Sequence, residues 1–139
     1  MFVNKVLINH RLSKYTDSRK LKPNALHYEL AKASEMNLIF YKEMNMQEAY
    51  ANQLVSFFFT ILKIWYQASV AEKDRAKGKE FMKKMEEYFS YYYCEIEAWS
   101  TETVRDVLVK YCIQLFKVSP KLWKHTVGDV RYKIIYRKN

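Results

Sequence analysis

The stretch LVSFFFTILKIWY (residues 54–66) is the most apolar run of the 139-residue chain. Between Ala49 and Ala71 the only charged residue is Lys63, so a membrane span has to be weighed. The apolar side chains favour insertion by about 3–5 kcal/mol in sum, and a lysine near the centre opposes it by about 3 kcal/mol. Six Asn, Gln, Ser and Thr side chains within the same bounds oppose it further. The run therefore predicts a central helix that its neighbours bury.

The composition around this run favours helices throughout. Half of the residues are hydrophobic and 17% are aromatic, which is enough for an ordered core. Glycine and proline number two each, too few for the frequent turns of a β-rich fold. We expect an all-α bundle of four to five helices preceded by a short extended segment. Residues 1–22 are predicted to form this extended segment and a basic loop, and residues 23–139 the helical domain.

Periodic apolar residues place the helices on either side of the central one. A helix that opens at Pro23 is expected to carry an apolar stripe of Leu26, Leu30, Ala33 and Phe40. The charged segment 72–79, which contains Gly78, is predicted to be a connection. After it, apolar residues recur at steps of three and four, as in an amphipathic helix; they are Phe81, Met85, Tyr88, Phe89, Tyr92, Ile96 and Trp99.

Capping signals set the expected helix boundaries. Asn45 with Glu48 resembles a capping box, so the central helix should begin near residue 46. Ser100 or Thr101 is predicted to cap a further helix, with inward side chains Val104, Leu108, Tyr111, Leu115 and Phe116. Ser119 and Pro120 are predicted to end that helix and begin a shorter basic one, with apolar contacts at Leu122, Trp123, Val127, Val130 and Ile134.

Residues that carry chemistry are sparse. Cys94 and Cys112 are too few for a disulfide framework or a zinc site, and we interpret them as reduced core residues, which fits a cytoplasmic setting. The three histidines lie far apart, without metal-ligand spacing. The chain has no Asp-x-Asp pair and no Gly-rich phosphate loop. We predict no metal, no cofactor and no self-sufficient catalytic site.

Positive charge is concentrated at the two ends of the sequence. The chain has a net charge of +9. Residues 1–22 hold six Lys and Arg against one Asp, a net +5, and residues 117–139 hold seven against one, a net +6. The segment between them is therefore slightly acidic. This distribution predicts an anionic partner that meets the ends of the chain, with solubilising lysines as the alternative.

The opening sequence KVLINHRLSKYTDSRKL (residues 5–21) resembles a segment of bacterial family 2 glycosyltransferases. There, the last strand of the catalytic domain ends in an aromatic residue or His followed by Arg, then a polar loop with Ser, then a helical tail. The likeness covers about residues 5–45. The nucleotide-sugar domain of that family, with its metal-holding acids, has no counterpart in these 139 residues.

The resemblance implies a C-terminal helical module of such a transferase, acting in cell-surface polysaccharide or teichoic-acid-like assembly. It implies a cytoplasmic location, or a peripheral one at the inner face of the membrane, and a catalytic glycosyltransferase domain as partner. It also implies a ligand-binding loop near the donor diphosphate, formed by His10, Arg11, Ser18 and Arg19. The alternative is a free-standing helical interaction domain that binds an anionic partner such as nucleic acid.

Two further surfaces are predicted from the residues themselves. The basic C-terminus suits an anionic membrane or another anionic partner, nucleic acid being less favoured; its binding residues are Lys121, Trp123, Lys124, Arg131 and Lys133. The apolar segment 2–8 and the tyrosines at 91–93 are expected to leave apolar surface uncovered in a monomer. We therefore expect self-association or a stabilising partner.

Overall fold

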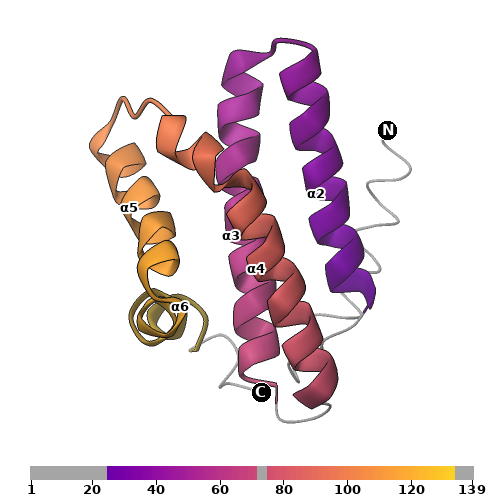
Figure 1. Ribbon diagram of the computed structural model, residues 1–139. Helices are drawn as coiled ribbons and strands as arrows, with labels where there is room; N and C mark the ends of the chain where they lie inside the picture. Colours follow the sequence, from indigo (N-terminus) through magenta and orange to yellow (C-terminus); the bar gives the residue numbers. More distant parts are fainter. Residues whose placement is uncertain (1–24, 72–74, 134–139) are drawn as a thin grey trace.

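The protein is an all-α bundle in the computed structural model, which describes residues 25–71 and 75–133 (Figure 1). Within these residues the chain forms five α-helices and a terminal π-helix, in the order α2 (Ala25–Glu43), α3 (Gln47–Ser69), α4 (Arg75–Ala98), α5 (Val104–Val118), α6 (Pro120–Trp123) and η1 (Lys124–Lys133). The predicted fold class is confirmed. The segment predicted as extended, and with it His10, Arg11, Ser18 and Arg19, lies outside the described residues.

The apolar run that dominates the sequence forms the middle of α3, which packs along both α2 and α4. Phe57, Phe58 and Ile61 are completely buried there. Over the part of the chain that the structure describes, no helix combines the length and apolarity needed to cross a membrane. The interpretation of this run as a central, neighbour-covered helix is therefore confirmed.

Helix α4 buries the side chains that its apolar spacing predicted. Phe81, Met85, Phe89 and Ile96 are buried, and Tyr88, Tyr92 and Trp99 pack against this core. Polar links add to the packing, since Trp65 donates to Glu86 at 2.9 Å and Tyr92 donates to Glu35 at 2.6 Å. The helix begins at Arg75, so the predicted connection over 72–79 is too long, and Gly78 is a buried helical residue.

The apolar stripe predicted for α2 is right only in part, because Leu26 and Leu30 are half-buried but its other two residues are not. Ala31 and Leu38 are the buried residues of this helix, whereas Ala33 and Phe40 are exposed. Helix α2 packs mainly on α3 and therefore buries only a narrow line of its surface. Since α2 has apolar residues on both sides of that line, periodicity alone wrongly assigned Ala33 and Phe40 to it.

Two helix starts differ from the predicted caps. Met46 precedes α3 without a side-chain cap, and Asn45 adopts φ 56°, a left-handed conformation that Asn tolerates. At α5 the cap is Thr103, whose Oγ1 accepts from the Asp106 N–H at 3.1 Å, while Asp106 accepts in return from the Thr103 N–H. Ser119 ends α5 and caps α6 ahead of Pro120, as predicted.

The inward side predicted for helix α5 is right at Phe116 and at half-buried Leu115, and wrong at Val104, Leu108 and Tyr111. Its buried residues are Ile113 and Phe116, whereas Val104, Leu108 and Tyr111 are 78%, 61% and 67% exposed. The reason is an aromatic cluster of Trp65, Phe89, Phe116 and Trp123, whose ring centroids lie 4.8–6.0 Å apart. Contacts of this size outweigh those of valine and leucine, so Phe116 fixes the inward side.

The cysteines are less buried than expected. Cys94 is exposed on α4, and Cys112 is half-buried on α5. Both are free thiols. The prediction that they belong to the core is therefore wrong for Cys94, which lies on the exposed side of α4.

Candidate functional site

The C-terminal elements α6 and η1 present cations at one end of the bundle. Lys121 and Arg131 are exposed and Lys124 is half-buried, with its Nζ 3.5 Å from the Ser69 carbonyl oxygen. The backbone of Lys133 belongs to η1, but its side chain is not among the described ones. These residues were predicted as a binding surface, and their exposure is compatible with that use.

Contacts with α3 hold η1 in place. The Tyr66 hydroxyl donates to Asp129 Oδ1 at 2.7 Å, and the Arg131 guanidinium lies 4.6 Å from the centre of the Phe59 ring. Gly128 lies so close to α3 that an added Cβ would be 2.7 Å from Tyr66 Cδ2. The π-helical backbone is thus fixed against the bundle, and its cations are carried on an anchored element.

Trp123 does not belong to the exposed surface. Its side chain is 1% exposed and packs in the aromatic cluster, in contact with Trp65 and Phe116. The prediction that Trp123 binds a membrane or partner is therefore wrong. The exposed apolar residues of this region are Leu122 (47%) and Val130 (75%), which had been predicted as packing contacts.

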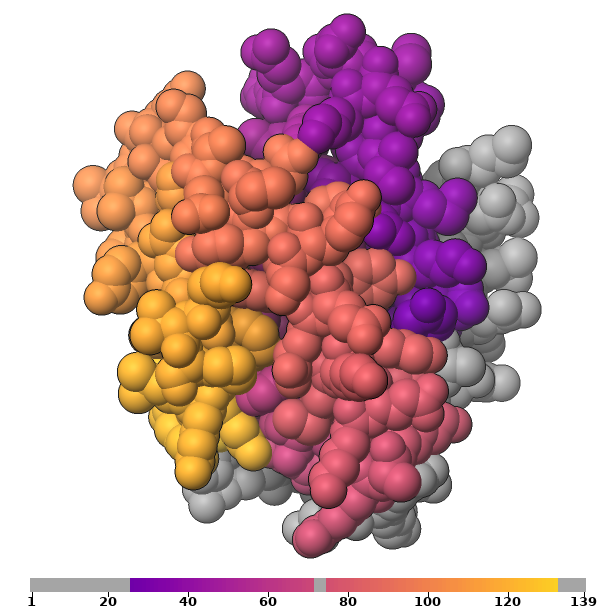
Figure 2. Space-filling view, viewed as in Figure 1, coloured from indigo at the N-terminus to yellow at the C-terminus, as the bar shows by residue number. Residues whose placement is uncertain are grey.

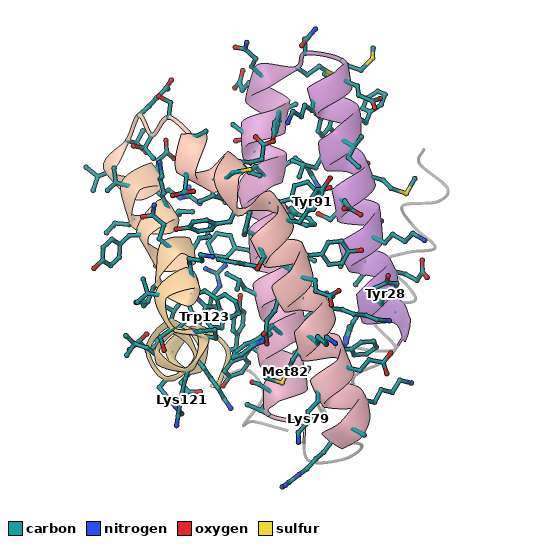
Figure 3. The ribbon with its side chains drawn as sticks, in the orientation of Figure 1. Tyr28, Lys79, Met82, Tyr91, Lys121 and Trp123 are labelled. Atoms are coloured by element: carbon teal, nitrogen blue, oxygen red, sulfur yellow. The ribbon has the colours of Figure 1, made fainter. Side chains whose placement is uncertain are left out.

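The first turns of α4 add cations that sequence reasoning missed. Arg75, Lys77 and Lys79 are exposed, with no acid in the first turn of the helix. Lys79 and Lys121 both lie at the lower end of the molecule in Figure 3. Cations at a helix N-terminus oppose the helix dipole. This unfavourable placement of Lys and Arg is the feature of the sequence from which the cations of α4 could have been recognised.

The opposite end of the bundle is acidic. There, α2 ends, α3 begins, α4 ends and α5 begins (Figure 1). Acids outnumber bases in these turns: Glu43, Glu48, Glu95, Glu97, Glu102 and Asp106 accompany Lys42, Arg105 and Lys110. The bundle is therefore polarised, with a basic end (Arg75, Lys77, Lys79, Lys117, Lys121, Lys124 and Arg131) and an acidic end.

An open groove of about 280 Å³ lies at the acidic end, beside the α2–α3 turn. Its polar lining is an ion pair between Lys42 and Glu95, with Tyr50 bonded to the same carboxylate. Trp99 and Met46 supply apolar lining. The hydrogen bond from Lys42 lowers the pKa of Glu95. The pKa of Tyr50 is raised, mainly by burial and to a smaller extent by the hydrogen bond with Glu95. Lys42 and Tyr50 thus satisfy the carboxylate, which leaves no activated base in the groove.

We expect the Glu95→Gln substitution to make the protein less sensitive to acid. Because the folded state lowers the pKa of Glu95 below 4.5, its contribution is present above that pH and is lost as the pH falls through the folded pKa. Since Lys42 is 62% exposed, the contribution is only about 0.5 kcal/mol. Urea unfolding between pH 3 and pH 7 measures it.

Glu97→Gln is the matched control, because Glu97 is exposed on the same helical turns. It should leave the pH dependence of the free energy of unfolding as in the wild type. Equal pH dependence in the wild type and Glu95→Gln would contradict the proposed role of the ion pair.

No constellation typical of catalysis is found among the described residues. His125 Nδ1 lies 3.4 Å from Asp129 Oδ2 within η1. Asp129 also accepts a hydrogen bond from Tyr66, and that bond joins η1 to α3. Across residues 25–71 and 75–133, no three His, Cys, Asp or Glu side chains gather as metal ligands. The described site is thus a charged surface.

Comparison with protein families, with curated proteins and with solved structures found no match for this chain.

Proposed function

We propose that this chain is a non-catalytic helical module, like the tail of a family 2 glycosyltransferase, and that its basic end docks on an anionic membrane surface. The observation that carries the docking is the gathering of exposed cations from α4 and α6–η1 at one end. Each Lys or Arg near an anionic surface contributes about 1 kcal/mol. The support for the transferase relationship is the sequence resemblance of residues 5–45.

The side chains around these cations favour lipid over nucleic acid. Leu122 and Val130 are exposed on α6 and η1, where apolar side chains can enter the headgroup region. Single-stranded nucleic acid is usually bound by stacking on exposed aromatic rings. In α6 and η1 the aromatic residues are Trp123 and Tyr132, and both are buried. A transferase that uses a lipid-linked acceptor would gain from such docking.

Co-sedimentation with liposomes tests the docking. The full chain should bind vesicles that contain an anionic phospholipid, more weakly at high salt, and not vesicles of neutral lipid alone. The Lys79→Gln/Lys121→Gln variant should lose about 2 kcal/mol, roughly a 30-fold decrease in partitioning.

The control is Lys32→Gln/Arg105→Gln, which removes the same charge from exposed sites on α2 and α5. An equal loss of binding in this variant would show that net charge, not the basic end, is responsible. Gel shifts with duplex and single-stranded nucleic acid run in parallel, and binding there without liposome binding would overturn the proposal. Turnover of a nucleotide sugar, abolished by His10→Ala or Arg11→Ala, would contradict the non-catalytic assignment.

A further inference from the structure

Helix α5 has a second apolar face, directed to solvent. Opposite the buried Ile113 and Phe116, it exposes five large apolar side chains: Val104, Val107, Leu108, Tyr111 and Val118. With half-buried Leu115, residues 104, 108, 111, 115 and 118 follow steps of 4, 3, 4 and 3. That spacing is the seam by which two helices pack in a coiled coil. Figure 2 shows α5 along the left edge of the molecule, with its outer side uncovered.

The size of this face suits an interface. Each exposed side chain offers on the order of 100 Å², so the five residues form an apolar patch of about 500 Å². Patches of this size on monomers often mark interaction sites. Two such patches with their polar rims reach about 1,200 Å² in total, the lower bound for a stable, specific dimer. One face of one helix is therefore sufficient.

Charge complementarity favours a second copy in antiparallel orientation. The charges of α5 itself do not flank this face, because Asp106 is held in the capping box with Thr103 and Lys117 lies over the Tyr93 ring of α4. The complementarity comes from the bundle as a whole, which has a basic end and an acidic end. In an antiparallel pair centred on Tyr111, the basic end of each copy lies next to the acidic end of the other.

We propose that two copies of this chain pair through the outer face of α5, antiparallel, about a two-fold axis at Tyr111. The pairing is isologous, so Val104 of one copy meets Val118 of the other, and Tyr111 meets its own equivalent. The contact lies on the outer side of α5 and does not depend on the docking proposed for the basic end.

Sedimentation equilibrium of the full chain should show a dimer. Leu108→Glu places a charge in the seam and should raise the dimer Kd by about 30-fold or more, the loss typical of a central interface residue. Because Leu108 is 61% exposed in the single chain, circular dichroism should be unchanged. Phe40→Glu is the matched control on the exposed side of α2 and should leave the dimer intact.

Oxidative cross-linking tests the orientation, in a background with Cys94→Ser and Cys112→Ala. Tyr111→Cys should cross-link with itself, Val104→Cys alone should not, and Val104→Cys mixed with Val118→Cys should. Cross-linking of Val104→Cys with itself would overturn the antiparallel arrangement. A monomer at high concentration, or a dimer that Phe40→Glu dissociates and Leu108→Glu does not, would overturn the interface.

Discussion

Replacing Trp123 by alanine is expected to lower the free energy of unfolding by about 3–5 kcal/mol. The side chain is 1% exposed and contacts Trp65 and Phe116, so its loss opens a cavity where α3, α5 and α6 meet. Gly128 also approaches the indole, since an added Cβ would lie 3.1 Å from Trp123 Cζ3. Urea unfolding followed by far-ultraviolet circular dichroism measures the loss without relying on the tryptophan itself.

The neighbouring Leu122→Ala is the control, because Leu122 is 47% exposed. It should change the free energy of unfolding by less than about 1 kcal/mol. The comparison of Trp123→Ala with Leu122→Ala distinguishes a core role of Trp123 from a membrane-binding role. A destabilised Trp123→Ala indicates a core residue, whereas unchanged stability with a loss of liposome binding would restore the membrane-anchoring role predicted from the sequence.

Phe57→Ala is expected to cost about 3–5 kcal/mol as well, through the packing of α3 against α4. The Phe57 ring is completely buried and meets the rings of Tyr88 and Tyr92 edge to face, at 5.9 and 5.0 Å. Such pairs add to the stabilisation from burial alone. The measurement is again the urea midpoint, with the slope of the transition checked for two-state behaviour.

Phe59→Ala provides the comparison within the same aromatic triplet. Phe59 is half-buried and supports Arg131 of η1. Its removal should cost less than half as much as Phe57→Ala. Equal losses would mean that the whole run is buried in solution, as it would be if further surfaces of α3 were covered in an assembly.

Sequence periodicity predicted the core where a helix has one apolar face. In α4 the apolar steps of three and four lie on a single side, so Phe81, Met85 and Phe89 were assigned correctly. In α5 two apolar faces share one helix, and the choice between them depends on Trp65, which is distant in sequence. No local pattern contains that information.

Helix boundaries were predicted only approximately, for a related reason. Ser100, Thr101 and Thr103 are all suitable cap residues. The structure selects Thr103 because Asp106, three residues later, completes the reciprocal pair. The same reciprocal spacing was sought at Asn45, where the backbone is left-handed and the residue that precedes α3 is Met46, which has no side-chain cap.

The candidate site was predicted in part, since Lys121 and Arg131 follow from charge counting along the chain. Lys77 and Lys79 were missed because they lie in a segment with a slightly acidic total. Only folding brings the beginning of α4 to the same end as α6. The ligand-binding role of His10, Arg11, Ser18 and Arg19 stays a prediction, because these residues lie outside the described part.

The direction of α2 has a consequence for anything attached ahead of it. This helix begins at the basic end and runs toward the acidic end, antiparallel to α3 (Figure 1). A domain joined ahead of residues 1–24 would therefore be attached at the end of the bundle that carries the docking surface. On a membrane, such a tether would turn a three-dimensional search for a lipid-borne acceptor into a two-dimensional one. The local concentration of acceptor would then depend on the length of the tether and not on the affinity of the active site.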